Sequence, residues 1–123
     1  MRVTSALWVG AYVRRCYAEG APAAVMKRGA EEAGAIFVIA DRLDGTGDLY
    51  APAPQASFDE GEPGDRLFQM VAPAAPLPEI NERLEREKRF DPDLWVVAVE
   101  DREGRAFLDV IGTIEKDTPT RNR

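Results

Sequence analysis

Two separate six-residue runs of the chain are apolar on both alternating sets of side chains. They are residues 35–40 (AIFVIA) and residues 94–99 (LWVVAV). Because successive side chains of a strand point to opposite faces, a strand with this composition is covered on both sides. We therefore expect both runs to be buried strands, and we expect residues 94–99 to form a central strand of a sheet.

Shorter segments around the first run predict further strands. Residues 23–28 form a short, mainly apolar segment that predicts one strand. Residues 48–51 (DLYA) predict a second strand, which follows the turn signal at residues 44–47 (DGTG). Together with residues 35–40, these two segments predict a three-stranded meander.

The N-terminal residues allow two interpretations. Residues 3–9 alternate in a way that predicts a short strand, whereas Val9, Tyr12, Val13, Cys16 and Tyr17 recur at helical spacing. A short strand that leads into a helix of about ten residues fits best, with Gly20 as the helix stop. A single helix over residues 5–18 is the competing interpretation.

The clearest predicted helix covers residues 79–89. Pro78 suits its first position, and Ile80 and Leu84 form a thin apolar stripe. Three acid-to-base pairs at i,i+4 spacing support it: Glu79–Arg83, Glu82–Arg86 and Glu85–Arg89. Residues 66–71 predict a strand before this helix, and we expect Pro73, Pro76 and Pro78 to break the chain between the two.

These elements predict one α+β domain over residues 1–112. We expect a largely antiparallel sheet of five or six strands with two helices packed on it, and the connection from residue 71 to 94 could allow one parallel pair. Residues 105–111 fit a returning strand or a short helix. Residues 52–65, with three prolines and four acids, predict a flexible acidic loop, and residues 113–123 predict a frayed polar tail.

The composition excludes several classes of site. The chain contains no histidine and one cysteine, Cys16. Catalytic arrangements that need a histidine base are therefore excluded, as are zinc sites built on histidine. Cys16 lies on the predicted apolar helix face, so we expect a buried core residue. One cysteine forms no internal disulfide, which favours a reducing, cytoplasmic compartment.

The net charge of −6 is unevenly distributed. Residues 1–30 carry five basic and one acidic side chain, whereas residues 31–65 carry one basic and nine acidic ones. An acidic protein repels phosphate backbones, so we do not expect nucleic-acid binding. No run approaches 18 apolar residues, so we expect no membrane span.

Residues 89–95 (RFDPDLW) hold the densest set of polar groups. Asp91 and Asp93 flank a proline that stiffens the backbone, and they could hold Mg²⁺ or orient a guanidinium. In the structural alternative, Asp91 terminates the helix and Asp93 tethers the turn through backbone N–H groups. Arg14, Arg42 and Arg89 are the basic side chains that could join them in a binding site for an anion. The turn at residues 44–47 lacks the third glycine of a dinucleotide fingerprint and the spacing of a calcium loop.

Several stretches resemble an uncharacterised alphaproteobacterial family, domain of unknown function 1491. The resemblance rests on residues 7–9 with Arg14–Arg15, on residues 33–35 and 42–45, and most strongly on residues 89–97 (RFDPDLWVV) followed by 100–102 (EDR). It covers roughly residues 3–110. It implies a single-domain bacterial protein and brings no catalytic residue with it.

The missing catalytic residue types and the segregated charge favour a non-catalytic binding or interaction module. Its partner would be an unidentified protein or a second copy in a homodimer, and we expect no cofactor. The alternative is a carboxylate-based, metal-dependent enzyme that acts on an anionic small molecule, with Asp91 and Asp93 as metal ligands and arginines such as Arg42 or Arg89 binding the substrate.

Overall fold

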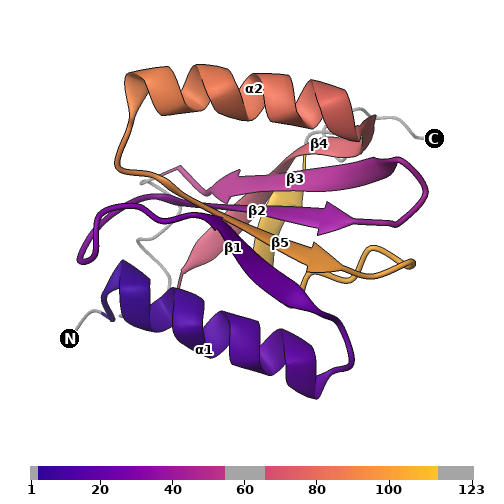
Figure 1. The fold of residues 1–123 in the computed structure, drawn as a ribbon, viewed down its shortest axis with the longest axis horizontal. Helices are drawn as coiled ribbons and strands as arrows, with labels where there is room; N and C mark the ends of the chain where they lie inside the picture. Colours follow the sequence, from indigo (N-terminus) through magenta and orange to yellow (C-terminus); the bar gives the residue numbers. More distant parts are fainter. Residues whose placement is uncertain (1–2, 55–65, 114–123) are drawn as a thin grey trace.

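The computed structural model describes residues 3–54 and 66–113. Over these residues the chain forms two helices and one six-stranded sheet, an α+β arrangement (Figure 1). The elements are α1 (Ser5–Ala18), β1 (Ala23–Lys27), β2 (Ile36–Asp41), β3 (Thr46–Pro52), β4 (Leu67–Pro76), α2 (Leu77–Phe90), β5 (Trp95–Glu100) and β6 (Asp109–Thr113).

The sheet is mixed, so the expectation of a largely antiparallel sheet was wrong. Its strand order is β1-β5-β2-β3-β4-β6. The pairs β2–β5 and β4–β6 are parallel, and the other three pairs are antiparallel. The two runs that are apolar on both faces, β2 and β5, are neighbours inside the sheet, as their composition predicts.

The two helices cover opposite faces of this sheet (Figure 1). Along β2, Ile36, Val38 and Ala40 pack on the α1 side, whereas Phe37 and Ile39 pack on the α2 side. The α1 side also buries Val9, Tyr12, Cys16, Trp95 and Val97, and the α2 side buries Ile80, Leu84, Leu49 and Val96. The molecule therefore has two apolar layers, which explains why β2 needs apolar residues at every position.

Residues 3–9 form no strand, and the competing single helix is correct. Thr4 is the N-cap of α1, and its Oγ1 accepts a hydrogen bond from the Leu7 backbone N–H at 3.2 Å. Ser5 and Val9 lie on the buried face of the helix, while Leu7 is 66% exposed. The capping hydroxyl and the i,i+4 spacing of the buried residues outweigh the short alternation.

The predicted meander was also wrong at its first strand. β2 and β3 form the expected hairpin, but β1 pairs with β5 and not with β2. The chain between β1 and β2 packs against the start of β5. Ala30 N–H donates to the Asp93 carbonyl, and a Cβ on Gly29 or Gly34 would collide with the Asp93 carbonyl oxygen. These glycines let β5 occupy the place between β1 and β2.

β4 continues through Pro73 to Pro76, although the prolines were expected to break the chain. Its register with β3 shifts twice, on either side of Leu49, and β6 pairs only with its first half. The bulged segment contains Ala74 at φ 44, and its N–H donates to Asp48 Oδ1 at 2.6 Å. Prolines are tolerated here because the ladder is already interrupted.

The remaining elements agree with the sequence in part. Pro78 lies in the first turn of α2, and Ile80 and Leu84 are its buried residues. The ion pairs that the structure shows on α2 are Lys88–Glu85 and Arg83–Glu87, in place of the three predicted ones. The C-terminal strand starts at Asp109, after an irregular segment at 105–108.

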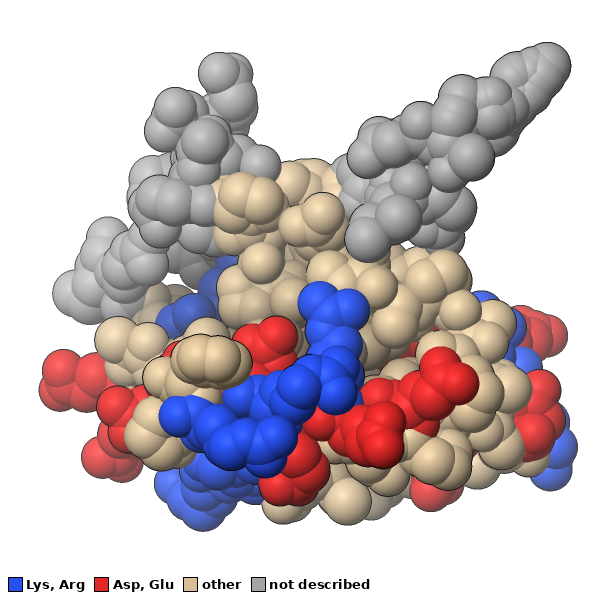
Figure 2. Space-filling view, turned by 90° about the horizontal axis from the view of Figure 1, so that it is seen from above, with Lys and Arg blue, Asp and Glu red and all other residues tan. Residues whose placement is uncertain are grey.

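Figure 2, which looks onto the molecule from above, shows side chains of both charges next to one another on this face.

Most of the predicted acidic loop and nearly all of the predicted tail lie outside the described residues. Within residues 3–54 and 66–113, neither helix is long and apolar enough to cross a membrane.

Candidate binding pocket

A pocket opens between α1 and the segment that leads into β6, with a volume of about 290 Å³. Its wall combines aromatic rings with charged groups from three distant parts of the chain. The lining residues are Val3, Trp8, Ala11, Tyr12, Arg15, Arg66, Phe107, Leu108 and Asp109. We call this cavity the α1 pocket.

One wall of the α1 pocket is aromatic. Trp8 and Tyr12 are one helical turn apart on α1, and their rings stack with centroids 5.0 Å apart and planes 10° apart. The Trp8 ring also lies 5.4 Å from the ring of Phe68 on β4. Residues at i and i+4 share a helix face, so the stack follows directly from the helical spacing of Trp8 and Tyr12.

Tyr12 fixes the position of the opposite wall. Its hydroxyl donates to the Ala106 carbonyl at 2.6 Å, across 94 residues of sequence. Burial, reinforced by the neighbouring Cys16, raises the pKa of the Tyr12 hydroxyl far above its usual value. Burial likewise raises the pKa of the Cys16 thiol, so both groups stay protonated and neutral at physiological pH. The expected core position of Cys16 is confirmed.

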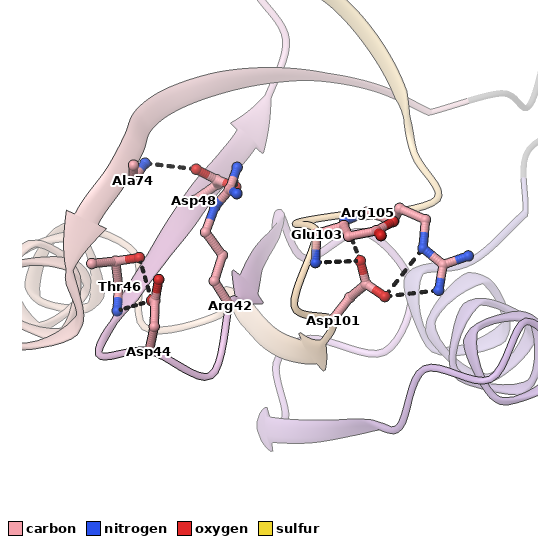
Figure 3. A network of polar contacts seen from close by, with 8 residues as sticks. All are labelled: Arg42, Asp44, Thr46, Asp48, Ala74, Asp101, Glu103 and Arg105. Carbon is pink, nitrogen blue, oxygen red and sulfur yellow. Dashed lines mark hydrogen bonds and ion pairs between the residues drawn. The ribbon is translucent and has the colours of Figure 1, made fainter.

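The segment 101–107 carries Phe107 into the α1 pocket. Asp101 accepts hydrogen bonds from the backbone N–H groups of Glu103 and Arg105, and from Nε and Nη2 of Arg105 (Figure 3). The Arg105 guanidinium in turn lies 5.1 Å from the centroid of the Phe107 ring. Phe107 itself has φ 57, a conformation that is unfavourable for an aromatic residue. The carboxylate–guanidinium pair therefore holds a strained part of the wall.

The charged groups of the α1 pocket are two guanidiniums and one carboxylate. Arg15 is exposed in the last turn of α1, and Arg66 Nη2 donates to the Val3 carbonyl at 2.9 Å. Asp109 lies at the start of β6. Among the described residues that line the pocket, two are guanidiniums and one is a carboxylate, in a chain whose net charge is −6, and the exposed guanidinium of Arg15 offers a charge-assisted hydrogen bond to an anion.

Of the residues proposed from the sequence, Arg42 lies in a partly buried ion pair. Its Nε and Nη2 contact Asp48 Oδ2 at 3.0 and 2.9 Å, and the Asp48 side chain is only 1% exposed (Figure 3). The guanidinium also lies against Gly104, where a Cβ would come within 2.6 Å of Nη2. Arg42 therefore braces the β2–β3 hairpin internally and packs against the loop after β5, while its partner Asp48 makes the link to β4.

Asp91 and Asp93 lie in the turn between α2 and β5. Asp91 Oδ1 accepts the backbone N–H of Asp93 at 3.1 Å, and the Asp93 carbonyl accepts the N–H of Ala30. Asp91 is the C-cap of α2, as expected, and it is the Asp91 carboxylate that tethers the turn, whereas Asp93 contributes its backbone N–H and carbonyl. Asp91 also lines a second hollow of about 210 Å³, together with Arg66 and Phe68.

The five proposed residues do not meet at one place. Arg14 is exposed on α1, and Arg89 is exposed at the end of α2. Arg42 follows the last residue of β2, whereas Asp91 precedes β5, whose first residue Trp95 pairs with the first residue of β2. The length of β2 therefore separates them by roughly 17 Å. Within residues 3–54 and 66–113, no three His, Cys, Asp or Glu side chains are grouped to hold a metal ion.

Trp8, Tyr12, Arg15, Arg66 and Phe107 were not proposed from the sequence. The spacing of Trp8 and Tyr12 could have suggested a stacked pair on a helix. Nothing local to residues 66 or 107 signals their position, because it follows from the pairing of β4 with β3 and β6.

Comparison with known proteins places the chain in a family. A crystal structure of a DUF1491 family protein from Caulobacter crescentus has 35% sequence identity and a TM-score of 0.74, over 91% of this chain and 100% of that one. A solution structure of a protein from A. tumefaciens has 46% identity and a TM-score of 0.78, over 90% and 96%. Both species are alphaproteobacteria, as the resemblance implied.

No curated protein matches the chain. The family described as "Protein of unknown function (DUF1491)" matches residues 3–109, close to the extent that the sequence motifs indicated. The chain belongs to the DUF1491 family.

Proposed function

We propose that this protein is a non-catalytic binding module whose α1 pocket takes a small anionic ligand with a flat apolar body. The observation that carries the proposal is the stacked Trp8–Tyr12 pair beside the exposed guanidinium of Arg15. Aromatic surface stabilises a flat apolar group, and a guanidinium binds a carboxylate or phosphate through charge-assisted hydrogen bonds.

The size of the α1 pocket defines the size of the ligand. Its volume of about 290 Å³ is at the small end of ligand pockets. A ligand of one or two fused rings with one acidic group fits this space. Asp109 also lines the pocket and adds a polar partner for a second substituent.

The titratable groups of the α1 pocket support binding without catalysis. Arginine stays protonated at every physiological pH. Tyr12 has a raised pKa and donates its proton to the Ala106 carbonyl, so it is held away from acid–base exchange. The carboxylate-based enzyme remains a prediction that rests on Asp91 and Asp93, and an unidentified protein partner likewise remains a prediction.

The proposal is tested with an acid and its neutral amide. We expect 2-naphthoate to bind in a calorimetric or NMR titration and 2-naphthamide to bind more weakly. Arg15→Gln should raise the Kd for 2-naphthoate by about tenfold, because one charge-assisted hydrogen bond is lost. Arg14→Gln is the matched control, since Arg14 is adjacent but does not line the pocket. Equal effects of the two variants, or equal binding of acid and amide, would contradict the proposal.

A further inference from the structure

Among the described residues, no strand pairs with the outer side of β1, and Ala23–Met26 of this strand carry no charge. β1 is the first strand in the sheet order, with β5 as its neighbour among the described residues. Ala24, Val25 and Met26 are exposed along it, Val25 by 37% and Met26 by 65%. A strand edge with exposed apolar side chains is a template for pairing with another strand.

The ladder with β5 shows which backbone groups point outward. Glu100 N–H donates to the Pro22 carbonyl, and Ala24 is aligned with Ala98. Since hydrogen-bonding direction alternates along an antiparallel strand, Pro22 and Ala24 direct their backbone groups to β5, and Ala23 and Val25 direct theirs away from it. Val25 therefore offers one donor and one acceptor at the edge.

The charge that would normally protect such an edge is turned inward. Lys27 Nζ donates to three backbone carbonyls of its own chain, those of Arg28, Pro92 and Leu94, at 3.0, 2.8 and 2.9 Å. Residues Ala23–Met26 carry no charge. A second copy that approaches this edge therefore meets no like charge directly opposite.

A hollow of about 300 Å³ lies beside β1. Its lining includes the small residues Ala24 and Ala98, the Met26 side chain of the same copy, the ring of Tyr17, and the carboxylates of Asp41 and Glu100. If two copies pair in antiparallel fashion about Val25, Met26 of each copy comes opposite Ala24 of the other. The large Met26 side chain of each copy then lies on the small Ala24 of the other, and the two-fold symmetry makes this contact occur twice.

We infer that this protein forms a symmetric homodimer by antiparallel pairing of β1 with β1 of a second copy, centred on Val25. The bulge between Val25 and Lys27 limits the shared ladder to a few residues. A contact this small gives a weak, concentration-dependent dimer. The inference is independent of the α1 pocket, so either can fail alone.

The test is sedimentation velocity over a concentration series up to about 1 mM. We expect the wild-type mass to rise from the monomer towards twice that value. Val25→Pro removes the outward N–H without removing a bond to β5, and Met26→Glu places a charge opposite Ala24; each should raise the dimer Kd at least about tenfold. Leu7→Glu is the matched control, because Leu7 is 66% exposed on α1, and it should leave the dimer unchanged.

Circular dichroism and Tm establish that the variants are folded. A second measurement does not depend on them: isotope-filtered NMR on mixed labelled and unlabelled wild-type protein should show contacts between Val25 residues of the two copies. A wild-type monomer across the whole series would overturn the inference. A dimer that survives both β1 variants, or one without the Val25 contact, would also overturn it.

Discussion

At the scale of single residues, Asp48 is the clearest case of a charge that the fold depends on. Its carboxylate is buried and accepts hydrogen bonds from Arg42 and from the backbone of Ala74, which has a positive φ. One side chain thus joins the β2–β3 hairpin to the bulged part of β4. The role of Arg42 is therefore to neutralise Asp48.

We expect Asp48→Ala to lower the free energy of unfolding by about 2–3 kcal/mol. Removing one partner of a buried pair costs about 3–5 kcal/mol, and the one-third exposure of the Arg42 side chain reduces that value. Urea denaturation of both proteins measures the difference. Asp44→Ala, in the exposed turn, is the control with a smaller effect. A stability of Asp48→Ala equal to that of wild type would contradict this account.

Asp101 makes the stability of the pocket wall depend on pH. Its hydrogen bonds from the Arg105 side chain and backbone lower the pKa of the Asp101 carboxyl below its usual value. A carboxyl whose pKa is lower in the folded state contributes stability above its unfolded pKa of about 4, and that contribution is lost as the pH falls through the lower folded pKa.

Asp101→Asn should therefore lower the Tm at pH 7, and its deficit relative to wild type should shrink as the pH falls below about 4. The measurement is Tm against pH for the two proteins under the same salt conditions. A deficit that stays constant with pH would show that the charge of Asp101 is not involved.

At the scale of elements, two glycine substitutions separate helix propensity from close packing. Gly10 lies within α1, and a Cβ there would meet nothing nearer than Arg14 Nη1 at 3.6 Å. Gly10→Ala should raise the free energy of unfolding by about 0.5–1 kcal/mol. Gly29→Ala should lower the free energy of unfolding, since its Cβ would collide with the carbonyl of Asp93, just before β5. Thermal denaturation distinguishes them, and the same sign for both would refute the packing argument.

The elements that could be predicted from the sequence are those whose structure follows from the apolar pattern of their own residues. β2 and β5 are apolar on both faces, and the stripe of Ile80 and Leu84 defines α2. The position of β1 in the sheet could not be predicted. It depends on the insertion of β5 between β1 and β2, and β5 lies about 60 residues further along the chain than β2. The helix at residues 5–18 was available as an alternative, and the decisive signal was the cap at Thr4.

The candidate pocket was less predictable than the fold for the same reason. In the sequence, Arg15 is noticeable only as one of two adjacent arginines. Arg66 and Phe107 come to line the α1 pocket through the pairing of β4 with β6. Conversely, Asp91 and Asp93 formed a dense polar motif whose backbone hydrogen bonds serve the turn before β5. Local density of charged residues was thus a poor guide to where side chains converge.

At the scale of the whole molecule, the metal-dependent alternative has its own test. If Asp91 were a ligand, Mg²⁺ or Mn²⁺ would raise the Tm by binding the folded state, and Asp91→Asn would abolish the rise. Because the Asp91 carboxylate accepts the N–H of Asp93, we expect instead that millimolar Mg²⁺ leaves the Tm unchanged and that Asp91→Asn lowers it in both conditions. A metal-dependent rise that is lost in Asp91→Asn would establish the alternative.

The layered fold separates the two surfaces proposed for binding. The α1 pocket lies towards β4 and β6, and the outer edge of β1 is at the other end of the strand order. A dimer through β1 would therefore leave the α1 pockets of both copies accessible.

The two tryptophans provide the most direct measurement of the central claim. Trp8 lines the α1 pocket, whereas Trp95 is fully buried and donates its Nε1–H to the Ala30 carbonyl. In a ¹H–¹⁵N NMR titration with 2-naphthoate, we predict that the indole resonance of Trp8 shifts progressively to saturation while that of Trp95 stays in place. A titration in which the Trp8 resonance does not move, or in which only Trp95 responds, would contradict the assignment of the α1 pocket as the binding site.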